Sequence, residues 1–314
     1  MPAATARHFE PTPLPRPDGA RLALRAMPAR GEATGAVVIA HGMAEHAGRY
    51  RRFAEALSDA GHAVFAADHR GHGATTAPGA ADGHFGAPLD TVLDDLEAVV
   101  SHARAQAPGV PLTLFGHSMG SILSLAATMR NPRLCDRLAC WNSGVDGGAL
   151  LAVFDGILRT QQMFLGSDVP STIARKLTFE TWNKRFAPNR TDFDWLSRDE
   201  AEVDAYVADP KCGFPVTIGL WRTVLDAVRM GGDDRRLAKL PKGLPVHLLG
   251  GADDPCSDDA AAMKRIANRM RAAGMGDVTF VRLPGTRHES LNELNREETT
   301  DAFVAWLEQR EETA

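Results

Sequence analysis

Short apolar runs alternate with amphipathic stretches along most of the chain, after a proline-rich start. The run GAVVIAHG at 35–42 is apolar almost throughout, which is typical of a strand buried in a parallel sheet. The stretch YRRFAEALSDAG at 50–61 repeats its apolar residues at helical spacing and ends on glycine, a common helix stop. This alternation predicts an α/β fold with a mostly parallel central sheet flanked by helices. The other predicted strands lie within 62–73, 110–118, 137–144, 243–255 and 277–285, and the other helices at 88–106, 119–132, 257–274 and 296–310.

The alternation is interrupted between residues 145 and 239, where helical patterns, aromatic residues and polar turns contain no convincing buried strand. This interruption is far longer than an ordinary connection between strands and helices. The sequence therefore predicts one α/β core made of residues 1–144 and 240–314, with a helical cap inserted at 145–239.

Composition and charge are ordinary for an enzyme-sized globular protein and exclude several classes of partner. The chain has 314 residues, of which 44% are apolar and 24% charged, and its net charge is −5. No long basic run occurs, so we expect no nucleic-acid partner. The sequence has no apolar signal region and no run of about 18 apolar residues, so we expect no membrane span. Four cysteines without CxxC spacing predict reduced thiols in a cytoplasmic protein, namely Cys135, Cys140, Cys212 and Cys256.

Ser118 stands between two glycines in FGHSMGS at 115–121, where a predicted strand passes directly into a predicted helix. A sharp strand-to-helix turn exposes such a serine above the sheet, which is the geometry of a nucleophile elbow. Gly116 and Gly120 suit a turn whose backbone segments approach too closely for Cβ atoms. The N–H groups that begin the helix favour a developing negative charge. The alternative is a glycine-rich helix entry with an idle serine.

A nucleophilic serine needs a base and an acid that orients this base. In the chain order expected here the histidine comes last, and His288 is the single histidine that follows Asp253 and Asp254. We expect Asp253 to be the acid, because it is the third residue past Gly250, where the turn leaves the strand. Asp254 is the alternative, and would otherwise be a helix-entry or surface carboxylate.

The negative oxygen that forms during ester cleavage needs two hydrogen-bond donors. The N–H of Met119, directly after the serine, is expected to be one of them. The second is expected to be the N–H of Met43, in the loop HGMAEHAGRY at 41–50. His41 in the same loop is expected to brace it rather than to react.

A cluster of histidines between residues 41 and 84 raises the alternative of a metal site. Their spacing is that of loop turns with glycines between them, and the sequence contains no HExxH. We therefore expect neither a metal nor an organic cofactor. The histidines concerned are His41, His46, His62, His69, His72 and His84.

Five motifs spread from residue 41 to residue 295 resemble the monoacylglycerol lipase and lysophospholipase branch of the α/β-hydrolase superfamily. They are HGMAEHAGRY, DHRGHG, GHSMGS, GGADDPCSD and GTRHESLNE, and WLSRDEAEVDAYVADPKCGF at 195–214 is also similar. The resemblance implies that the insertion is a cap over the active site with an apolar acyl-binding channel. It assigns Ser118 as nucleophile, His288 as base and Asp253 as acid, and the N–H groups of Met43 and Met119 as oxyanion donors.

The predicted function is hydrolysis of carboxylic esters through an acyl-enzyme, with a small ester or lipid of the monoacylglycerol or lysophospholipid type as substrate. The helix predicted at 150–165 has an apolar face, which is expected to point to the entrance of the channel or to a membrane surface. Peripheral membrane contact through the cap is therefore one alternative. This face carries Leu151, Phe154, Leu158 and Leu165.

Other functions of the same scaffold remain alternatives. The serine at position 118 argues against dehalogenases and epoxide hydrolases, which need an aspartate there. An acyltransferase would use the same three residues, and a non-catalytic binding protein usually loses one of them. An aminopeptidase would need a cap carboxylate to hold a free amine, for which the candidates are Glu180, Asp199, Glu200 and Glu202.

Overall fold

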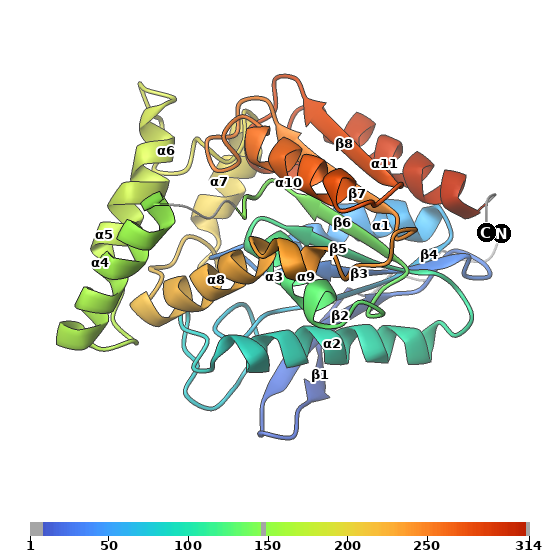
Figure 1. The fold of residues 1–314 in the computed structure, drawn as a ribbon, viewed down its shortest axis with the longest axis horizontal. Helices are drawn as coiled ribbons and strands as arrows, with labels where there is room; N and C mark the ends of the chain where they lie inside the picture. Colours follow the sequence, from blue (N-terminus) through green and yellow to red (C-terminus); the bar gives the residue numbers. More distant parts are fainter. Residues whose placement is uncertain (1–8, 146–148, 312–314) are drawn as a thin grey trace.

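A central sheet in the strand order β1-β2-β4-β3-β5-β6-β7-β8 organises the computed structural model, which describes residues 9–145 and 149–311 (Figure 1). The strands are β1 (Thr12–Pro15), β2 (Arg21–Met27), β3 (Gly35–Ala40), β4 (His62–Ala67), β5 (Leu112–His117), β6 (Arg137–Trp141), β7 (Val246–Gly251) and β8 (Val278–Leu283). All pairings from β4 to β8 are parallel, whereas β1 and β2 run antiparallel at one edge. The sheet is therefore mostly parallel, as the apolar pattern predicts.

The antiparallel strands β1 and β2 lie in the proline-rich start, where the apolar pattern indicated no element. Leu22 and Leu24 of β2 are nevertheless buried in the core. The prolines of this region, Pro13 and Pro15, sit in the edge strand β1, where a missing N–H donor is tolerated.

Helices cover both faces of the sheet: α1 (Arg51–Asp59), α2 (Leu89–Gln106), α3 (Met119–Arg130), α10 (Ala261–Ala272) and α11 (Arg296–Glu311). Successive side chains of a strand point to opposite faces, so each face has its own hydrophobic layer. Val37 of β3 packs in one cluster with Phe53 of α1 and Phe303 of α11. Its neighbour Val38 belongs to the opposite cluster, together with buried residues of α2, α3 and α10.

The segment between β6 and β7 is helical in its described part. Its elements are α4 (Ala149–Leu165), α5 (Thr172–Arg175), a π-helical turn (Lys176–Glu180), α6 (Thr181–Lys184), α7 (Glu200–Ala208), α8 (Ile218–Gly231) and α9 (Asp234–Leu237). Helices α4, α5 and α6 stand apart from the sheet at the left of Figure 1, whereas α8 packs against α3 of the core. We use the predicted bounds 145–239 when we refer to the cap.

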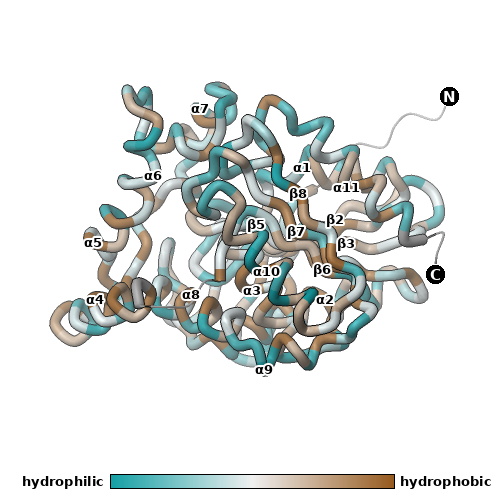
Figure 2. Tube along the Cα trace, turned by 45° about the horizontal axis from the view of Figure 1, so that its top comes forward, coloured by the Kyte–Doolittle hydropathy of each residue, from teal (hydrophilic) through white to brown (hydrophobic). Residues whose placement is uncertain are grey.

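Hydropathy along the chain follows this architecture, with hydrophobic segments on the central strands and polar turns outside them (Figure 2). Hydrophobic segments also occur on α4 and α5, at the outer end of the molecule (Figure 2). Among the described residues, no helix is both long enough and apolar enough to cross a lipid bilayer.

The carboxyl ends of β3, β5, β7 and β8 meet at one edge of the sheet, because these strands are parallel. The loops that leave these strands therefore converge there, beneath the cap. They carry the predicted site residues in four separate parts of the sequence.

Candidate active site

Ser118 and His288 meet at this edge, as their order along the chain predicts. The Nε2 atom of His288 lies 2.9 Å from Oγ of Ser118. Ser118 connects β5 to α3 with φ 53° and ψ −118°, a conformation that residues other than glycine rarely adopt. Such local strain is often found at functional sites, where it directs a reactive side chain away from the backbone.

The glycines on either side of Ser118 allow two backbone segments to touch. A Cβ atom at Gly116 would overlap the carbonyl oxygen of Gly120. A Cβ atom at Gly120 would overlap the carbonyl oxygen of Ala40, at the end of β3. The close approach that the sequence predicts is therefore present, and it brings the end of β3 beside the serine.

The carboxylate that contacts His288 belongs to Asp254, so the prediction of Asp253 for this position is wrong. Nδ1 of His288 lies 3.0 Å from Oδ1 of Asp254, which is fully buried. Strand β7 continues to Gly251, and the turn that follows is closed by a hydrogen bond from the N–H of Asp254 to the carbonyl of Gly251. The prediction counted three residues from Gly250, but the strand ends one residue later, at Gly251. The residue that faces inward is therefore Asp254 rather than Asp253.

Asp253 is part of the same turn but is only half-buried. Its N–H donates to the carbonyl of Thr286 at 2.9 Å, which ties the turn to the loop that carries His288. No hydrogen bond joins its carboxylate to another described residue. Asp253 thus contributes main-chain support to this loop, and its side chain has no contact with the histidine ring.

Asp254 is held as a carboxylate by its hydrogen bonds. Burial raises its pKa, but the charge and the hydrogen bond of His288 lower it, and the net pKa lies below the ordinary value. The N–H of Cys256 donates to Oδ1 at 2.9 Å, and the hydroxyl of Ser257 donates to Oδ2 at 2.6 Å. A buried carboxylate with this many donors can orient an imidazole and stabilise it when it gains a proton.

The expected oxyanion donors lie on either side of Ser118. Met119 is the first residue of α3, where backbone N–H groups have no partner within the helix. Within the described residues, neither the N–H of Met119 nor that of Met43 has a hydrogen-bond partner. Both donors are therefore available to a substrate oxygen above the serine.

His41 orients the peptide that carries the N–H of Met43, in line with its predicted bracing role. Nδ1 of His41 donates to the carbonyl of Gly42 at 2.7 Å, and its Nε2 accepts the N–H of His69 at 2.9 Å. Because C=O and N–H point in opposite directions across a trans peptide, holding this carbonyl also directs the N–H of Met43. Burial and the neighbouring histidines lower the pKa of His41 well below its ordinary value, so the ring is neutral.

A cavity of about 470 Å³ lies over Ser118 and His288. Its apolar wall is formed by Met43, Phe179, Phe193, Trp195, Leu196, Phe214, Val216 and Trp221. Polar residues also line it, among them Arg175, Glu180, Asn183, Lys184, Asn189, Arg190, Thr191 and Asp192. The cavity is therefore part apolar and part polar, whereas the resemblance implied an apolar channel.

The cap also covers the histidine directly. The ring of Trp195 lies 4.7 Å from that of His288, centroid to centroid, and Phe179 is stacked on Trp195. The N–H of Glu289 donates to the carbonyl of Leu196 at 2.8 Å, which joins the loop of the histidine to the same cap segment. These contacts keep His288 almost wholly buried.

The cap carboxylates considered for amine binding lie mostly outside the cavity. Asp199 pairs with Arg296 and Glu202 with Arg52, and neither carboxylate lines the cavity wall. Of the four candidates, only Glu180 lines it. Glu180 lies 3.5 Å from Arg175, which also forms an ion pair with Asp192 at 3.1 Å.

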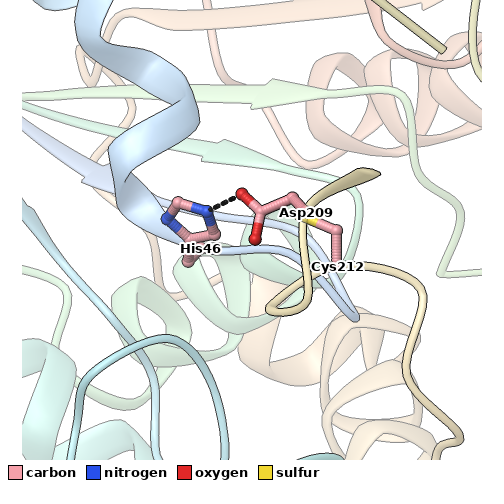
Figure 3. Close-up of side chains that lie close together, drawn as sticks. All are labelled: His46, Asp209 and Cys212. Atoms are coloured by element: carbon pink, nitrogen blue, oxygen red, sulfur yellow. Dashed lines mark hydrogen bonds and ion pairs between the residues drawn. The ribbon is translucent and has the colours of Figure 1, made fainter. Parts of the chain in front are cut away.

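His46, Asp209 and Cys212 lie close together where the loop after β3 meets the chain after α7 (Figure 3). One potential ligand atom of each lies within 4.8 Å of the others, so we tested this cluster as a metal site. Nδ1 of His46 accepts the N–H of Gly48 at 3.2 Å, so Nε2 carries the hydrogen and donates to Asp209 at 2.9 Å. A metal ligand would need a free lone pair at Nε2. The cluster is therefore a hydrogen-bonded link between core and cap.

The chain is similar to known enzymes over most of its length. The family model described as "Serine aminopeptidase, S33" matches residues 31–295. A monoacylglycerol lipase of Mycolicibacterium smegmatis is 30% identical over 87% of this chain and 88% of its own. The phospholipase YtpA of Bacillus subtilis is 34% identical over 87% of this chain and 95% of its own.

Solved structures show the same fold. A thermostable carboxyl esterase from Bacillus coagulans, solved with glycerol, superposes with a TM-score of 0.86 at 21% identity, over 98% of this chain and 99% of its own. The chain therefore belongs to the serine aminopeptidase S33 family, in the monoacylglycerol lipase-like branch of the α/β-hydrolases, and is a carboxylic ester hydrolase.

Proposed function

We propose that the chain hydrolyses esters with a single acyl chain, of the monoacylglycerol type, with Ser118 as nucleophile, His288 as base and Asp254 as acid. The observation that carries this proposal is the continuous row of hydrogen bonds from Asp254 through His288 to Ser118. A serine in this setting can be activated, because the buried carboxylate holds the imidazole in the tautomer that accepts a proton at Nε2.

In the proposed mechanism, Nε2 of His288 takes the hydroxyl proton of Ser118 as Oγ attacks the ester carbonyl. The resulting oxyanion accepts hydrogen bonds from the N–H groups of Met43 and Met119. The protonated His288 then gives its proton to the leaving alcohol, and an acyl-enzyme remains. A water molecule, deprotonated by His288, attacks this acyl group, and collapse of the second intermediate releases the acid and restores the serine.

The cavity supports an ester with an apolar acyl part and a polar alcohol part. Its apolar lining can accept an acyl chain, and its polar lining can hydrate or bind a hydroxylated leaving group. The monoacylglycerol lipase of M. smegmatis, with its 30% identity, supports the same substrate class. An aminopeptidase is less well supported, because only Glu180 of the four candidate carboxylates lines the cavity.

The outer surface of the cap supports contact with a lipid surface. Met163 and Phe164 at the end of α4 are 73% and 75% exposed, which is unusual for large apolar side chains. We call the exposed set the apolar cap patch; it comprises Val153, Met163, Phe164, Leu165, Ile173 and Leu177. Leu165 thus belongs to an exposed surface, whereas Leu158 of the same predicted face is buried.

Part of the apolar cap patch lies on a helical stretch that also lines the cavity. Ile173 and Leu177 lie in the same helical stretch as Arg175 and Phe179, which line the cavity. A lipid surface that covered the patch would therefore lie beside the entrance. We propose that the lipid surface is the source of the substrate. We also propose that the enzyme acts in the cytoplasm, in keeping with four thiols that form no disulfide.

The proposal is tested by kcat/KM for glycerol monoesters from acetyl to palmitoyl, kept below their micellar limits, with aminoacyl amides in parallel. Each buried methylene contributes at most about 0.8 kcal/mol, so kcat/KM should rise steeply with chain length until the apolar wall is filled. A maximum at acetyl or butyryl would contradict the lipid substrate. A preference for aminoacyl amides would assign the aminopeptidase activity instead.

A further inference from the structure

Four titratable side chains, three of them buried and Arg49 half-buried, form a cluster beside the active site. They are Glu45 in the loop after β3, Arg49 in the turn that follows, His117 directly before the serine, and Glu289 directly after His288. Arg49 binds both oxygens of Glu289, at 2.6 and 2.7 Å, and Oε2 of Glu45 at 2.8 Å. The proposed mechanism uses none of these side chains, although each is next to a part of the site.

His117 connects two sides of the site. Its Nε2 lies 3.0 Å from the carbonyl oxygen of His288. Because a carbonyl only accepts, Nε2 must carry a hydrogen and donate it. Nδ1 of His117 faces Oε1 of Glu45 at 3.5 Å.

Glu45 carries this connection to the oxyanion loop. Its Oε1 accepts the N–H of Gly42 at 2.6 Å and the hydroxyl of Tyr50 at 2.8 Å. Gly42 is therefore held on both sides: Glu45 accepts its N–H, and His41 donates to its carbonyl, which shares a peptide group with the N–H of Met43. The next N–H along the chain is that of Met43, the proposed oxyanion donor.

We propose that His117 is a positively charged positioning residue, which donates to the main chain of His288 and forms an ion pair with the carboxylate of Glu45, and so holds the loop of the base against the oxyanion loop. This inference rests on the proposed function. With a proton on Nδ1, the ring donates to His288 through Nε2, and its positive charge faces the Glu45 carboxylate 3.5 Å from Nδ1. Without it, a lone pair at Nδ1 faces the Glu45 carboxylate, and the two groups repel each other.

The surroundings of His117 favour the charged ring. Burial lowers its pKa, but the nearby Glu45 carboxylate raises it, and the net pKa lies above the ordinary value. The other titratable and charged groups that face it are Arg49 and Tyr50 from the loop after β3, and His288 and Glu289 from the loop after β8. Burial and Glu45 raise the pKa of Tyr50 well above its ordinary value, so this group stays neutral. Burial lowers the pKa of Arg49, but the charge of Glu289 outweighs this effect, so its pKa is well above the ordinary value and the group stays charged.

Glu45 and Glu289 stay ionised down to acid pH. Burial raises the pKa of each carboxyl. The pKa of Glu45 is nevertheless lowered by His117 and Arg49, and that of Glu289 by Arg49, so both pKa values lie below the ordinary value. Of these four charged side chains, His117 is thus the first to lose its charge as the pH rises above neutral. The contribution of its charge is complete below the ordinary histidine pKa and is lost as the pH rises through the raised pKa.

Two substitutions separate the hydrogen bond of His117 from its charge. His117→Gln keeps an N–H donor near the position of Nε2 but removes the charge, and His117→Asn removes both. We expect His117→Asn to lower kcat about 100-fold with KM nearly unchanged, because a misplaced base affects the reaction more than binding. His117→Gln should lose less kcat at neutral pH. We expect the kcat of the native protein to fall as the pH rises through the pKa of His117, and this fall should be absent in His117→Gln.

The matched control is His102→Gln on α2, which removes an imidazole outside the site and should keep the native pH profile. Glu45→Gln should move the alkaline fall in kcat to lower pH, because the raised pKa of His117 depends on that carboxylate. Native kcat, KM and pH profile in both His117 variants would overturn the proposal, as would an unchanged alkaline fall in Glu45→Gln.

The protonation state of His117 can be measured without any substrate. Imidazole nitrogen chemical shifts should show a doubly protonated His117 ring at pH 6 in the native protein, and a neutral ring there would overturn the proposal. If the native protein cleaves no ester, the proposed function is wrong. The positioning role of His117 is then tested by the rate at which a fluorophosphonate labels Ser118 instead of by kcat. A roughly 100-fold slower labelling of His117→Asn supports the positioning role, and native labelling rates overturn it.

Discussion

Oδ1 of Asp254 lies 3.0 Å from Nδ1 of His288, and both side chains are almost wholly shielded from water. The pair leaves only the Nε2 edge of the imidazole to face the serine. The proton on Nδ1 is therefore held between two buried groups, and the orientation of the ring depends on one carboxylate.

Asp254→Asn should lower kcat by about 10²–10⁴-fold, because an amide can stabilise the wrong tautomer of His288. Asp253→Asn is the matched control. It changes the neighbouring carboxylate but leaves the N–H that binds Thr286, so we expect nearly native kcat. Steady-state kinetics with a short soluble ester measures both, and the reverse order of the two variants would restore Asp253 as the acid.

Ser118→Ala and His288→Ala should each lower kcat by at least about 10³-fold, with the fold intact. Ser101→Ala, which removes an exposed hydroxyl on α2, is the control and should be silent. Esterase activity and circular dichroism are measured on the same preparations. High residual activity in either active-site variant, with contaminating esterases excluded, would contradict the proposed roles.

Met43→Leu should be nearly silent, because only the backbone N–H acts on the oxyanion. Met43→Pro removes this donor and should cost about 3–4 kcal/mol in the activation free energy. The measurement is kcat/KM of the two variants with one ester. If leucine were as harmful as proline, the side chain rather than the backbone would be the functional group at this position.

The double variant Met163→Gln, Phe164→Gln should reduce binding to phospholipid vesicles and hydrolysis of vesicle-bound monoacylglycerol. It should leave the hydrolysis of a short soluble ester unchanged, because these side chains lie outside the cavity. Val207→Gln, another exposed apolar position at 51%, is the control outside the patch. Equal loss with the soluble and the vesicle-bound substrate would exclude a docking role.

The acid stability of the fold should depend on Asp254. Its pKa is lowered in the folded protein, so its stabilising contribution is present above the unfolded carboxyl pKa and is lost as the pH falls through the folded value. Urea unfolding between pH 7 and pH 3 should therefore show a smaller loss of unfolding free energy for Asp254→Asn than for the native chain. An equal loss of unfolding free energy in the two proteins would show that this carboxylate contributes nothing to the pH dependence of stability.

The core elements could be predicted because their signals are local. The apolar run of β3 and the helical spacing of α1 indicate their structure within a few residues of sequence. Strands β1 and β2 were missed because they are stabilised by pairing at the sheet edge, and prolines in β1 hide the pattern. The exposure of Met163 and Phe164 could not be predicted, because it depends on which side of α4 meets the rest of the cap.

The sequence by itself determined the serine in its glycine turn, the single late histidine and the loop of Met43, because residue spacing and chain order carry this information. Only the tertiary structure decided that Asp254 rather than Asp253 contacts His288, because that choice depends on the residue at which β7 stops pairing with β8. Only the tertiary structure also brought Glu45, His117 and Glu289 together. These residues are far apart in sequence, and the parallel sheet places the ends of their strands at one edge.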